Sequence, residues 1–280
     1  MIDLHVHSTV SDGSNTPTEI LKMAYDKKIY ALALTDHDNI EGLEEAQREA
    51  EKYNIKFIKG IELSVAYGEG RLLHILGLGI DPSNKYFLKV YNKLRKTREE
   101  GLEELLRVLA TRDVSIGMEE LRNYGAGEYL DRQAVSKYLI DKGICQNAAD
   151  AWQNYLDPIP YGQGELFEID EAIESIKKAG GLSFLAHYHK KIGFEGYTKE
   201  EMETHMERLV ALGLDGIEQY YPSYTEEEAQ YAEYLINKYS LLPSGGSDFH
   251  GANRADIALG TGDGSFVVPD SVYENIKLRL

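Results

Sequence analysis

Short apolar runs alternate along this chain with longer segments whose apolar residues recur at helical spacing. The apolar runs predict strands at residues 2–6, 31–35, 56–63, 72–78, 182–186, 215–219 and 241–245. The intervening segments predict helices at residues 16–28, 41–53, 170–179, 200–212 and 225–239. Because the strands show little alternation of apolar and polar residues, we expect them to be buried on both faces, as in a parallel sheet. The order favours an α/β barrel or an open doubly wound sheet.

One long stretch, residues 84–165, departs from this alternation because it holds no convincing strand. Helical spacing predicts helices at residues 85–110, 118–123, 132–142 and 147–156 instead. We therefore expect a barrel formed by residues 1–83 and 166–280, with a helical insertion at residues 84–165 between its fourth and fifth strands. The insertion is interpreted as a cap over the substrate.

Charge and composition limit the classes of partner. The formal net charge of −17 argues against tight binding to long nucleic acids, because a polyphosphate would be repelled. No segment resembles a signal peptide, and none approaches the roughly 20 apolar residues that span a bilayer. The single cysteine, Cys145, cannot form an internal disulfide. We therefore expect a cytoplasmic protein without a membrane partner.

Most of the eight histidines lie in or just after predicted strands, close to acidic residues. His5 and His7 are two residues apart, so a strand would place both imidazoles on one face, where they can bind one ion. The C-terminal ends of parallel strands meet at one rim, where such folds build active sites. Burying unpaired carboxylates and imidazoles there would be costly, and divalent cations compensate them directly. Only His205 falls inside a predicted helix, and it is interpreted as a solvated surface residue.

These segments together resemble the PHP (polymerase and histidinol phosphatase) family of metal-dependent phosphoesterases. The similarity runs through "DLHVHSTVSDGSNTP", "ALALTDHDNIEGL", "GIELS", "LHILGLGID", "LAHYHK", "GIEQYYPSYTEEE" and "GGSDFHG", in the family order. It implies an α/β fold, a distorted (β/α)7 barrel of the TIM-like kind. Within the family, the chain is most similar to the single-domain branch of nucleoside 3′,5′-bisphosphate phosphatases and 5′–3′ exoribonucleases.

The resemblance also implies site residues. Carried over motif by motif, the metal ligands are His5, His7, Asp12, His37, Glu62, His74, His187, Asp248 and His250. They imply two or three divalent ions (Mn²⁺, Zn²⁺, Fe²⁺ or Mg²⁺), with Glu62 as a bridging carboxylate and Asp36 orienting a ligand histidine. The expected catalytic residues are Asp36, His37, Glu62, Arg132 and Lys190, and the expected phosphate contacts are Arg132, Lys190 and His189.

The implied reaction is hydrolysis of a phosphomonoester, with a nucleotide or a short 5′-phosphorylated oligonucleotide as the substrate. Three divalent ions carry more charge than Asp12, Glu62 and Asp248 return, which suits a phosphate dianion better than a neutral amide. The hypothesis is that a hydroxide bridging the metals attacks phosphorus. The glycines of "SGGSDFHG" are interpreted as room for the backbone to pack near the metals.

Two departures from the branch pattern concern the substrate and not the metals. The segment "YLDRQAVSKYL" has Ala134 where relatives carry a histidine, and "AHYHK" has Tyr188 where they carry a proline. The alternatives left open are a 5′–3′ exonuclease on short RNA or DNA, a histidinol-phosphate phosphatase, an amidohydrolase-like C–N hydrolase and a non-catalytic accessory module. The amidohydrolase alternative would require a bridging lysine, and Lys59 does not occupy the bridging position, which holds Glu62.

Overall fold

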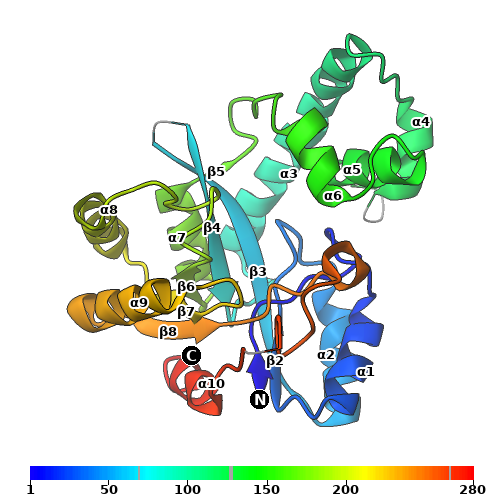
Figure 1. The fold of residues 1–280 in the computed structure, drawn as a ribbon. Coiled ribbons are helices and arrows are strands. Elements are labelled where there is room, and N and C mark those ends of the chain that lie inside the picture. Colours follow the sequence, from blue (N-terminus) through cyan, green and yellow to red (C-terminus); the bar gives the residue numbers. More distant parts are fainter. Residues whose placement is uncertain (69, 126–128, 265) are drawn as a thin grey trace. The chain divides into compact units, whose positions relative to one another are not determined.

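The structure is a computed structural model that describes residues 1–68, 70–125, 129–264 and 266–280. The chain divides into two compact units, one formed by Met1–Leu88 with Phe167–Leu280 and the other by Lys89–Leu166. The first unit contains the sheet, and the described residues of the second unit form helices and connecting segments (Figure 1). The prediction that the helical insertion caps the substrate stays a prediction.

The sheet of the first unit is curled and follows the order β1-β2-β3-β4-β6-β7-β8, with β5 paired to β3. Its strands are β1 (Ile2–Asp3), β2 (Ala31–Leu34), β3 (Lys56–Tyr67), β4 (Arg71–Leu78), β5 (Phe167–Glu168), β6 (Leu182–Leu185), β7 (Gly216–Tyr220) and β8 (Leu242–Gly245). Backbone hydrogen bonds from Leu4 to Gly245 and from Asp248 to His5 join the chain beside the two edge strands. The α/β fold with a curled, barrel-like sheet is therefore confirmed, and strands lie in all seven predicted places.

The prediction of a parallel sheet is wrong at β4, which runs antiparallel to both β3 and β6. An apolar run does not report the direction of a strand, because a strand buried on both faces has the same composition either way. β3 also extends to Tyr67, and its register pairs Ser64 with His74. Glu62 and His74 therefore lie inside a long hairpin, and Glu62 does not end its strand as expected.

Among the described residues, six α-helices lie wholly in the first unit: α1 (Pro17–Asp26), α2 (Leu43–Tyr53), α7 (Ile169–Lys178), α8 (Lys199–Leu212), α9 (Glu226–Tyr239) and α10 (Asp270–Lys277). Three of them, α1, α8 and α9, begin with a threonine whose side chain accepts a hydrogen bond from the backbone of a glutamate three residues later. Each glutamate returns the contact to the threonine backbone, so these capping boxes explain where the helices start. No helix in the described ranges is long and apolar enough to cross a membrane.

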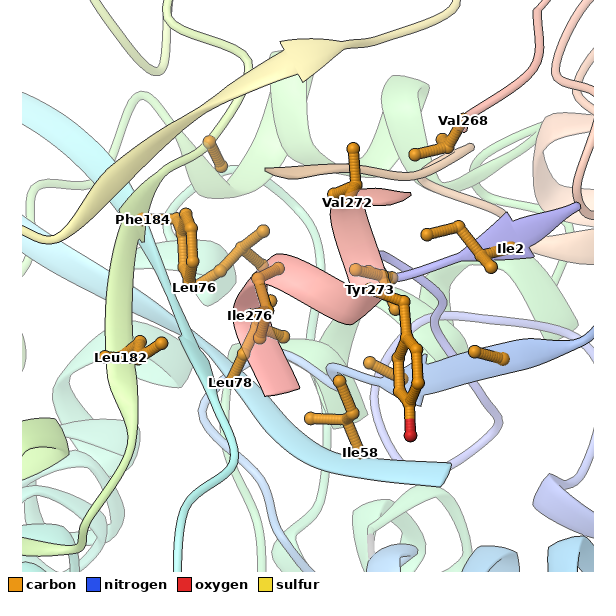
Figure 2. Packing of buried hydrophobic residues seen from close by; sticks show 14 of the residues in the cluster. Ile2, Ile58, Leu76, Leu78, Leu182, Phe184, Val268, Val272, Tyr273 and Ile276 are labelled. Atoms are coloured by element: carbon orange, nitrogen blue, oxygen red, sulfur yellow. The ribbon is translucent and has the colours of Figure 1, made fainter. Parts of the chain in front are cut away.

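Helix α10 was not predicted, and it fixes which rim of the sheet is open for chemistry. Val272, Tyr273 and Ile276 of α10 pack in one buried cluster with Ile2 and with Leu182, residues at the starts of β1 and β6 (Figure 2). Burying apolar side chains of this size contributes roughly 1.5–3 kcal/mol each. The amino-terminal ends of these parallel strands are therefore sealed with hydrocarbon, which leaves the opposite rim to carry polar groups.

The second unit has its own hydrophobic core. Its elements are the greater part of α3 (Lys85–Ala110), then α4 (Met118–Leu121), a 3₁₀ turn (Arg122–Tyr124), α5 (Arg132–Asp141), α6 (Ala148–Ala151) and a π-helix (Trp152–Leu156). Leu105 and Leu109 of α3 pack with Val135 and Leu139 of α5 in this core. The thiol of Cys145 is buried there, and burial raises its pKa, which is consistent with a structural role.

Candidate metal centre

The carboxylate of Glu62, on β3, lies at the centre of a cluster of imidazoles in the first unit. Its Oε2 atom is 3.0 Å from His5 Nε2, 3.1 Å from His7 Nε2 and 3.2 Å from His37 Nδ1. Its Oε1 atom is 3.0 Å from a ring nitrogen of His74, on β4, and of His187, in the loop after β6. This arrangement surrounds one buried carboxylate with nitrogen donors from five places in the sequence.

A second carboxylate, from the loop after β8, faces the two histidines at the start of the chain. Asp248 Oδ1 lies 3.2 Å from His7 Nε2 and 3.5 Å from His5 Nε2. The two imidazoles flank Val6, whose backbone pairs with Phe249. The HxH spacing therefore directs both Nε2 atoms to the same pair of carboxylate oxygens, as expected for residues on one face of an extended segment.

A third carboxylate extends the cluster away from Glu62. Asp12 Oδ1 lies 3.2 Å from His250 Nε2 and 3.7 Å from His7 Nδ1, and Asp12 Oδ2 lies 3.8 Å from His37 Nε2. The other ring nitrogen of His250 lies 2.8 Å from the backbone oxygen of Asp248. That contact favours a proton on His250 Nδ1, which leaves Nε2 free to act as a ligand.

All nine side chains predicted as metal ligands therefore lie in one cluster. Within it, three groups have donor atoms that are all within 4.8 Å of one another. They are His7, Asp12, His37 and His250; His5, His7, Glu62 and Asp248; and His37, Glu62 and His74. His187 joins the cluster through its contact with Glu62.

The hydrogen bonding of the cluster fits bound metal. Nδ1 of His7 and Nδ1 of His187 are buried without a hydrogen-bond partner in the part of the chain that the structure describes, and Nε2 of His7 and Nδ1 of His37 and of His74 face only carboxylate oxygens, at 3.0–3.2 Å. Native proteins rarely leave buried polar atoms without a partner. The number of such ring nitrogens in one cluster therefore indicates a partner other than a protein donor or acceptor, namely a metal ion. Imidazole and carboxylate donors at this spacing suit Zn²⁺, Mn²⁺ or Fe²⁺.

The pKa shifts of two carboxyls and two imidazoles of the cluster agree with a set of metal donors. Burial opposes ionisation of Glu62 and Asp248, yet the surrounding imidazoles hold the pKa of each carboxyl well below its usual range. Burial lowers the pKa of His37 to about 4 and that of His187 to about 3, because desolvation disfavours the imidazolium ion. At pH 7 both imidazoles are therefore neutral, the form that binds a metal.

Three of the loops that follow strands hold a non-glycine residue at positive φ. These residues are Asp38 (φ 46°), His187 (φ 25°) and Asp248 (φ 54°), after β2, β6 and β8. Such conformations cost on the order of 1–3 kcal/mol each and persist where the surrounding structure imposes them. Two of the three are predicted ligands, so the strain lies where the cluster is assembled. The backbone is also crowded at Gly246, where a Cβ atom would lie 2.3 Å from the backbone nitrogen of His5.

Sequence reasoning missed Glu218, the last buried residue of β7. Its Oε1 lies 2.9 Å from His5 Nδ1, and its Oε2 accepts a hydrogen bond of 2.7 Å from the backbone N–H of His187. Its side chain is fully buried, and burial raises its pKa. By accepting the Nδ1 proton of His5, Glu218 directs Nε2 toward Glu62 and Asp248. The signal was present in the sequence, because "GIE" at residues 216–218 repeats the "GIE" that contains Glu62.

The second oxygen of Asp248 is held by three donors. Tyr221 donates its hydroxyl over 2.5 Å, Arg254 donates Nη1–H over 2.6 Å, and Lys190 Nζ lies 3.3 Å away. Lys190 also donates to the Tyr221 hydroxyl. The side chains of Lys190 and Arg254 are 33% and 27% exposed, so both cations can also face solvent beside the cluster. Lys190 was predicted to contact phosphate; Arg254, four residues after His250, was missed.

Two other predicted residues lie near the cluster without joining it. Asp36 was expected to orient a ligand histidine, but its carboxylate accepts hydrogen bonds of 2.6–2.7 Å from Ser8 and Ser11. It therefore holds the loop that connects His7 with Asp12. His189 Nε2 lies 2.8 Å from Ser223 Oγ.

Arg132 belongs to the second unit, where it starts α5, and its contacts do not support the predicted role at a phosphate. Its guanidinium donates hydrogen bonds of 2.7–2.9 Å to the backbone oxygens of Leu156, Ile159 and Pro160. It also stacks 4.0 Å from the centre of the Tyr161 ring and is only 9% exposed. These contacts hold residues 156–161 against α5, so we interpret Arg132 as a structural residue.

The interpretation of His205 as a solvated surface residue is wrong. Its ring stacks on Phe194 and Tyr197, with ring centres 5.3 and 4.8 Å apart. Its Nδ1 lies 2.9 Å from the hydroxyl of Tyr67, at the end of β3. The exposed face of α8 expected from the sequence is covered here by the segment that follows β6, a tertiary contact that helical spacing does not report.

Comparison with known proteins gives consistent results. The family model described as "PHP domain" matches residues 3–179. A 5′–3′ exoribonuclease of Haemophilus influenzae is 32% identical over 89% of this chain and 89% of its own. A 3′,5′-nucleoside bisphosphate phosphatase of Chromobacterium violaceum is 31% identical over 100% of this chain and 97% of its own.

Solved structures support the fold. One from Chromobacterium violaceum, described as an amidohydrolase with bound sulfate and no metal, is 28% identical and superposes with a TM-score of 0.82, covering 99% of this chain and 96% of that one. One from Bifidobacterium adolescentis gives the same TM-score at 23% identity, covering 99% of this chain and 95% of that one.

Proposed function

This chain belongs to the PHP domain family and is a metal-dependent phosphoesterase, and we propose that its substrate is a phosphomonoester of a nucleotide or of a short 5′-phosphorylated oligonucleotide. The observation that carries the proposal is the buried cluster around Glu62, with Lys190 and Arg254 beside it. Relatives similar over nearly the whole chain are named for nucleotide and RNA substrates, which supports this class.

The proposal includes two or three divalent ions, Mn²⁺, Zn²⁺, Fe²⁺ or Mg²⁺, held by the nine clustered ligands. When bound, such ions supply Lewis acidity, which makes water a nucleophile near neutral pH and offsets the charge of phosphoryl oxygens. Glu62 has contacts through both of its oxygens, which supports a role as a bridging ligand. The donor set comes from elements spread over the first unit alone.

Lys190 and Arg254 are proposed to bind the phosphoryl group. Both cations touch Asp248 and both keep part of the side chain exposed, so an incoming phosphate oxygen can share their N–H donors. Arg254 offers a planar fork that matches phosphate geometry, and Lys190 a mobile point charge. Neutralising the phosphoryl oxygens is a large part of what catalysts of phosphoryl transfer do.

Three serines next to the cluster, Ser8, Ser11 and Ser247, use their hydroxyls as hydrogen-bond donors to buried carboxylates, which supports water as the nucleophile. Ser8 and Ser11 donate their hydroxyls to Asp36, and Ser247 donates its hydroxyl to Asp3. All three are buried, so attack on phosphorus by one of these hydroxyls would break a short hydrogen bond to a buried carboxylate.

The test is to strip the protein with a chelator, add back Mn²⁺, Zn²⁺, Fe²⁺ or Mg²⁺ singly, and measure release of inorganic phosphate. Adenosine 3′,5′-bisphosphate, a short 5′-phosphorylated RNA and histidinol phosphate are compared at each metal. We expect no activity in the stripped protein, recovery with at least one metal, and a preference for the nucleotide or the RNA. A preference for histidinol phosphate would contradict the proposed substrate class, and no hydrolysis with any metal would contradict the enzyme assignment.

A further inference from the structure

A cavity of about 370 Å³ lies in the first unit, at the segment that follows β6. Its walls combine aromatic and apolar side chains with charged ones, and the former are Tyr188, Phe194 and Tyr197 from that segment, Met202 of α8 and Tyr231 of α9. The volume is within the range of small-molecule sites, about 300–1,000 Å³. The cavity is distinct from the metal cluster, since no predicted ligand lines it.

The cavity nevertheless begins next to the cluster. His187 Nε2 lies 3.0 Å from Glu62, and Lys190 Nζ lies 3.3 Å from Asp248. The two residues between them, Tyr188 and His189, both line the cavity. Because consecutive Cα atoms are about 3.8 Å apart, the cavity wall starts within one residue of the centre on either side. The segment that carries His187 and Lys190 to the cluster therefore also supplies part of the cavity wall.

The walls are fixed before any ligand arrives. Tyr188 donates its hydroxyl to the backbone oxygen of Glu228 over 2.7 Å, and Tyr231 donates to that of Lys199 over 3.0 Å. The Arg71 side chain, at the start of β4, donates to the backbone oxygens of residues 193 and 195. Because these hydroxyls already have acceptors, a ligand would meet the tyrosines through their rings, although the Tyr231 ring also stacks on Tyr234 and has the Lys199 ammonium 5.4 Å from its centre. A wall that is held in place loses little conformational entropy on binding.

The charge on the lining selects against a second phosphate. Glu195, Glu227 and Glu228 line the cavity with a single lysine, Lys199, and that lysine lies 2.8 Å from Glu227. An anion would meet an excess of carboxylates, whereas a flat, uncharged ring with N–H donors would meet aromatic surface and hydrogen-bond acceptors. Nucleobases have these properties, and their stacking on aromatic side chains contributes to binding with little dependence on the base.

We propose that this cavity binds the nucleobase next to the phosphate that is hydrolysed. The inference rests on the proposed function, which it deepens by assigning the base-binding part of the site to residues 188–202 and to α9. It makes the enzyme selective for nucleotides over sugar phosphates through KM. It also predicts that the identity of the base matters less than its presence.

The experiment compares 2′-deoxyadenosine 3′,5′-bisphosphate with the same bisphosphate lacking its base, 1,2-dideoxyribose 3,5-bisphosphate. Tyr231→Ala removes one wall of the cavity. Tyr239→Ala is the matched control, because Tyr239 lies on the same helix, is also half-buried and also donates to a backbone oxygen of α8, that of Glu203, but does not line the cavity. We expect Tyr231→Ala to raise KM for the nucleotide about tenfold and to leave KM for the baseless substrate within twofold.

Binding of free adenosine to the metal-loaded protein, measured by equilibrium dialysis, tests the cavity without any hydrolysis. We expect saturable binding that Tyr231→Ala weakens about tenfold and Tyr239→Ala leaves unchanged. The inference would be overturned if Tyr231→Ala changed KM equally for both substrates, or if the affinity for adenosine were the same in Tyr231→Ala and in the wild type. Failure of the wild-type protein to hydrolyse either bisphosphate would instead overturn the proposed function, and adenosine binding would still decide whether the cavity holds a base.

Discussion

Replacing Glu218 by glutamine removes a charge from behind the metal centre while keeping the size of the side chain. The carboxylate accepts two hydrogen bonds at once, from His5 Nδ1 over 2.9 Å and from the His187 backbone N–H over 2.7 Å. An amide has only one oxygen. In either orientation the NH₂ group of the amide therefore faces one of these two partners. Facing the His187 backbone N–H, it meets another donor; facing His5, it requires the imidazole to change its tautomer.

The magnitude follows from this geometry. If the amide nitrogen faces His5, the ring accepts at Nδ1 and carries its proton on Nε2, the atom directed at Glu62 and Asp248. If it faces His187, two buried donors oppose each other, which disturbs the strained backbone at φ 25°. Losing a partner of this kind costs about 10–100-fold in metal affinity or activity. We expect the apparent dissociation constant for Mn²⁺ to rise by that factor, and saturating metal to restore most of kcat.

The assay is a metal titration in which binding is measured by calorimetry and activity by the release of phosphate. Asp215→Asn is the matched control, because Asp215 immediately precedes β7 and also accepts two hydrogen bonds from β6, both from Ser183, but lies at the other end of the strand. Both bonds reach one oxygen, Oδ2, which the amide oxygen of asparagine can replace, so Asp215→Asn should leave both the metal affinity and the free energy of unfolding close to those of the wild type. Metal affinity that is equal in Glu218→Gln and wild type would refute the assignment of Glu218 as a positioning residue.

Three further outcomes are expected. Hydrogen bonds to Asp248 and Glu62 outweigh burial and raise the pKa of His7 to about 10, so metal must displace a proton there; titrations at pH 6, 7 and 8 should show affinity that rises with pH, and pH-independent affinity would contradict the ligand assignment. Asp248→Asn should lower kcat by more than about 100-fold at any metal concentration, since Asp248 contacts both the cluster and the two cations, whereas unchanged kinetics with a folded circular dichroism spectrum would remove it from the site. Arg132→Ala should lower the free energy of unfolding by about 2–4 kcal/mol in urea titrations, because three carbonyl oxygens lose their donor; loss of kcat/KM at full stability would instead restore the predicted phosphate contact.

Local patterns in the sequence were enough for most of the strands and helices, although not for α10. Apolar runs located the strands, and the structure shows that threonine-to-glutamate capping boxes start α1, α8 and α9. The two-residue period of an extended chain aligned His5 with His7. These features depend on neighbours within a few residues, so spacing alone reports them. The prediction of nine clustered donors came from the resemblance, and the structure brings the same nine together.

The tertiary structure decided what depends on strand direction and register. β4 runs antiparallel, so Glu62 and His74 meet inside a hairpin and not at strand ends. Glu218 reaches His5 across 213 residues of sequence because β7 ends beside the first loop. Arg132, by contrast, donates its hydrogen bonds to backbone carbonyl oxygens of its own unit. Hydrogen-bond partners are selected by distances in space, which residue spacing does not encode. This is why the residues that surround the nine clustered side chains and hydrogen-bond to them could not be predicted from the sequence.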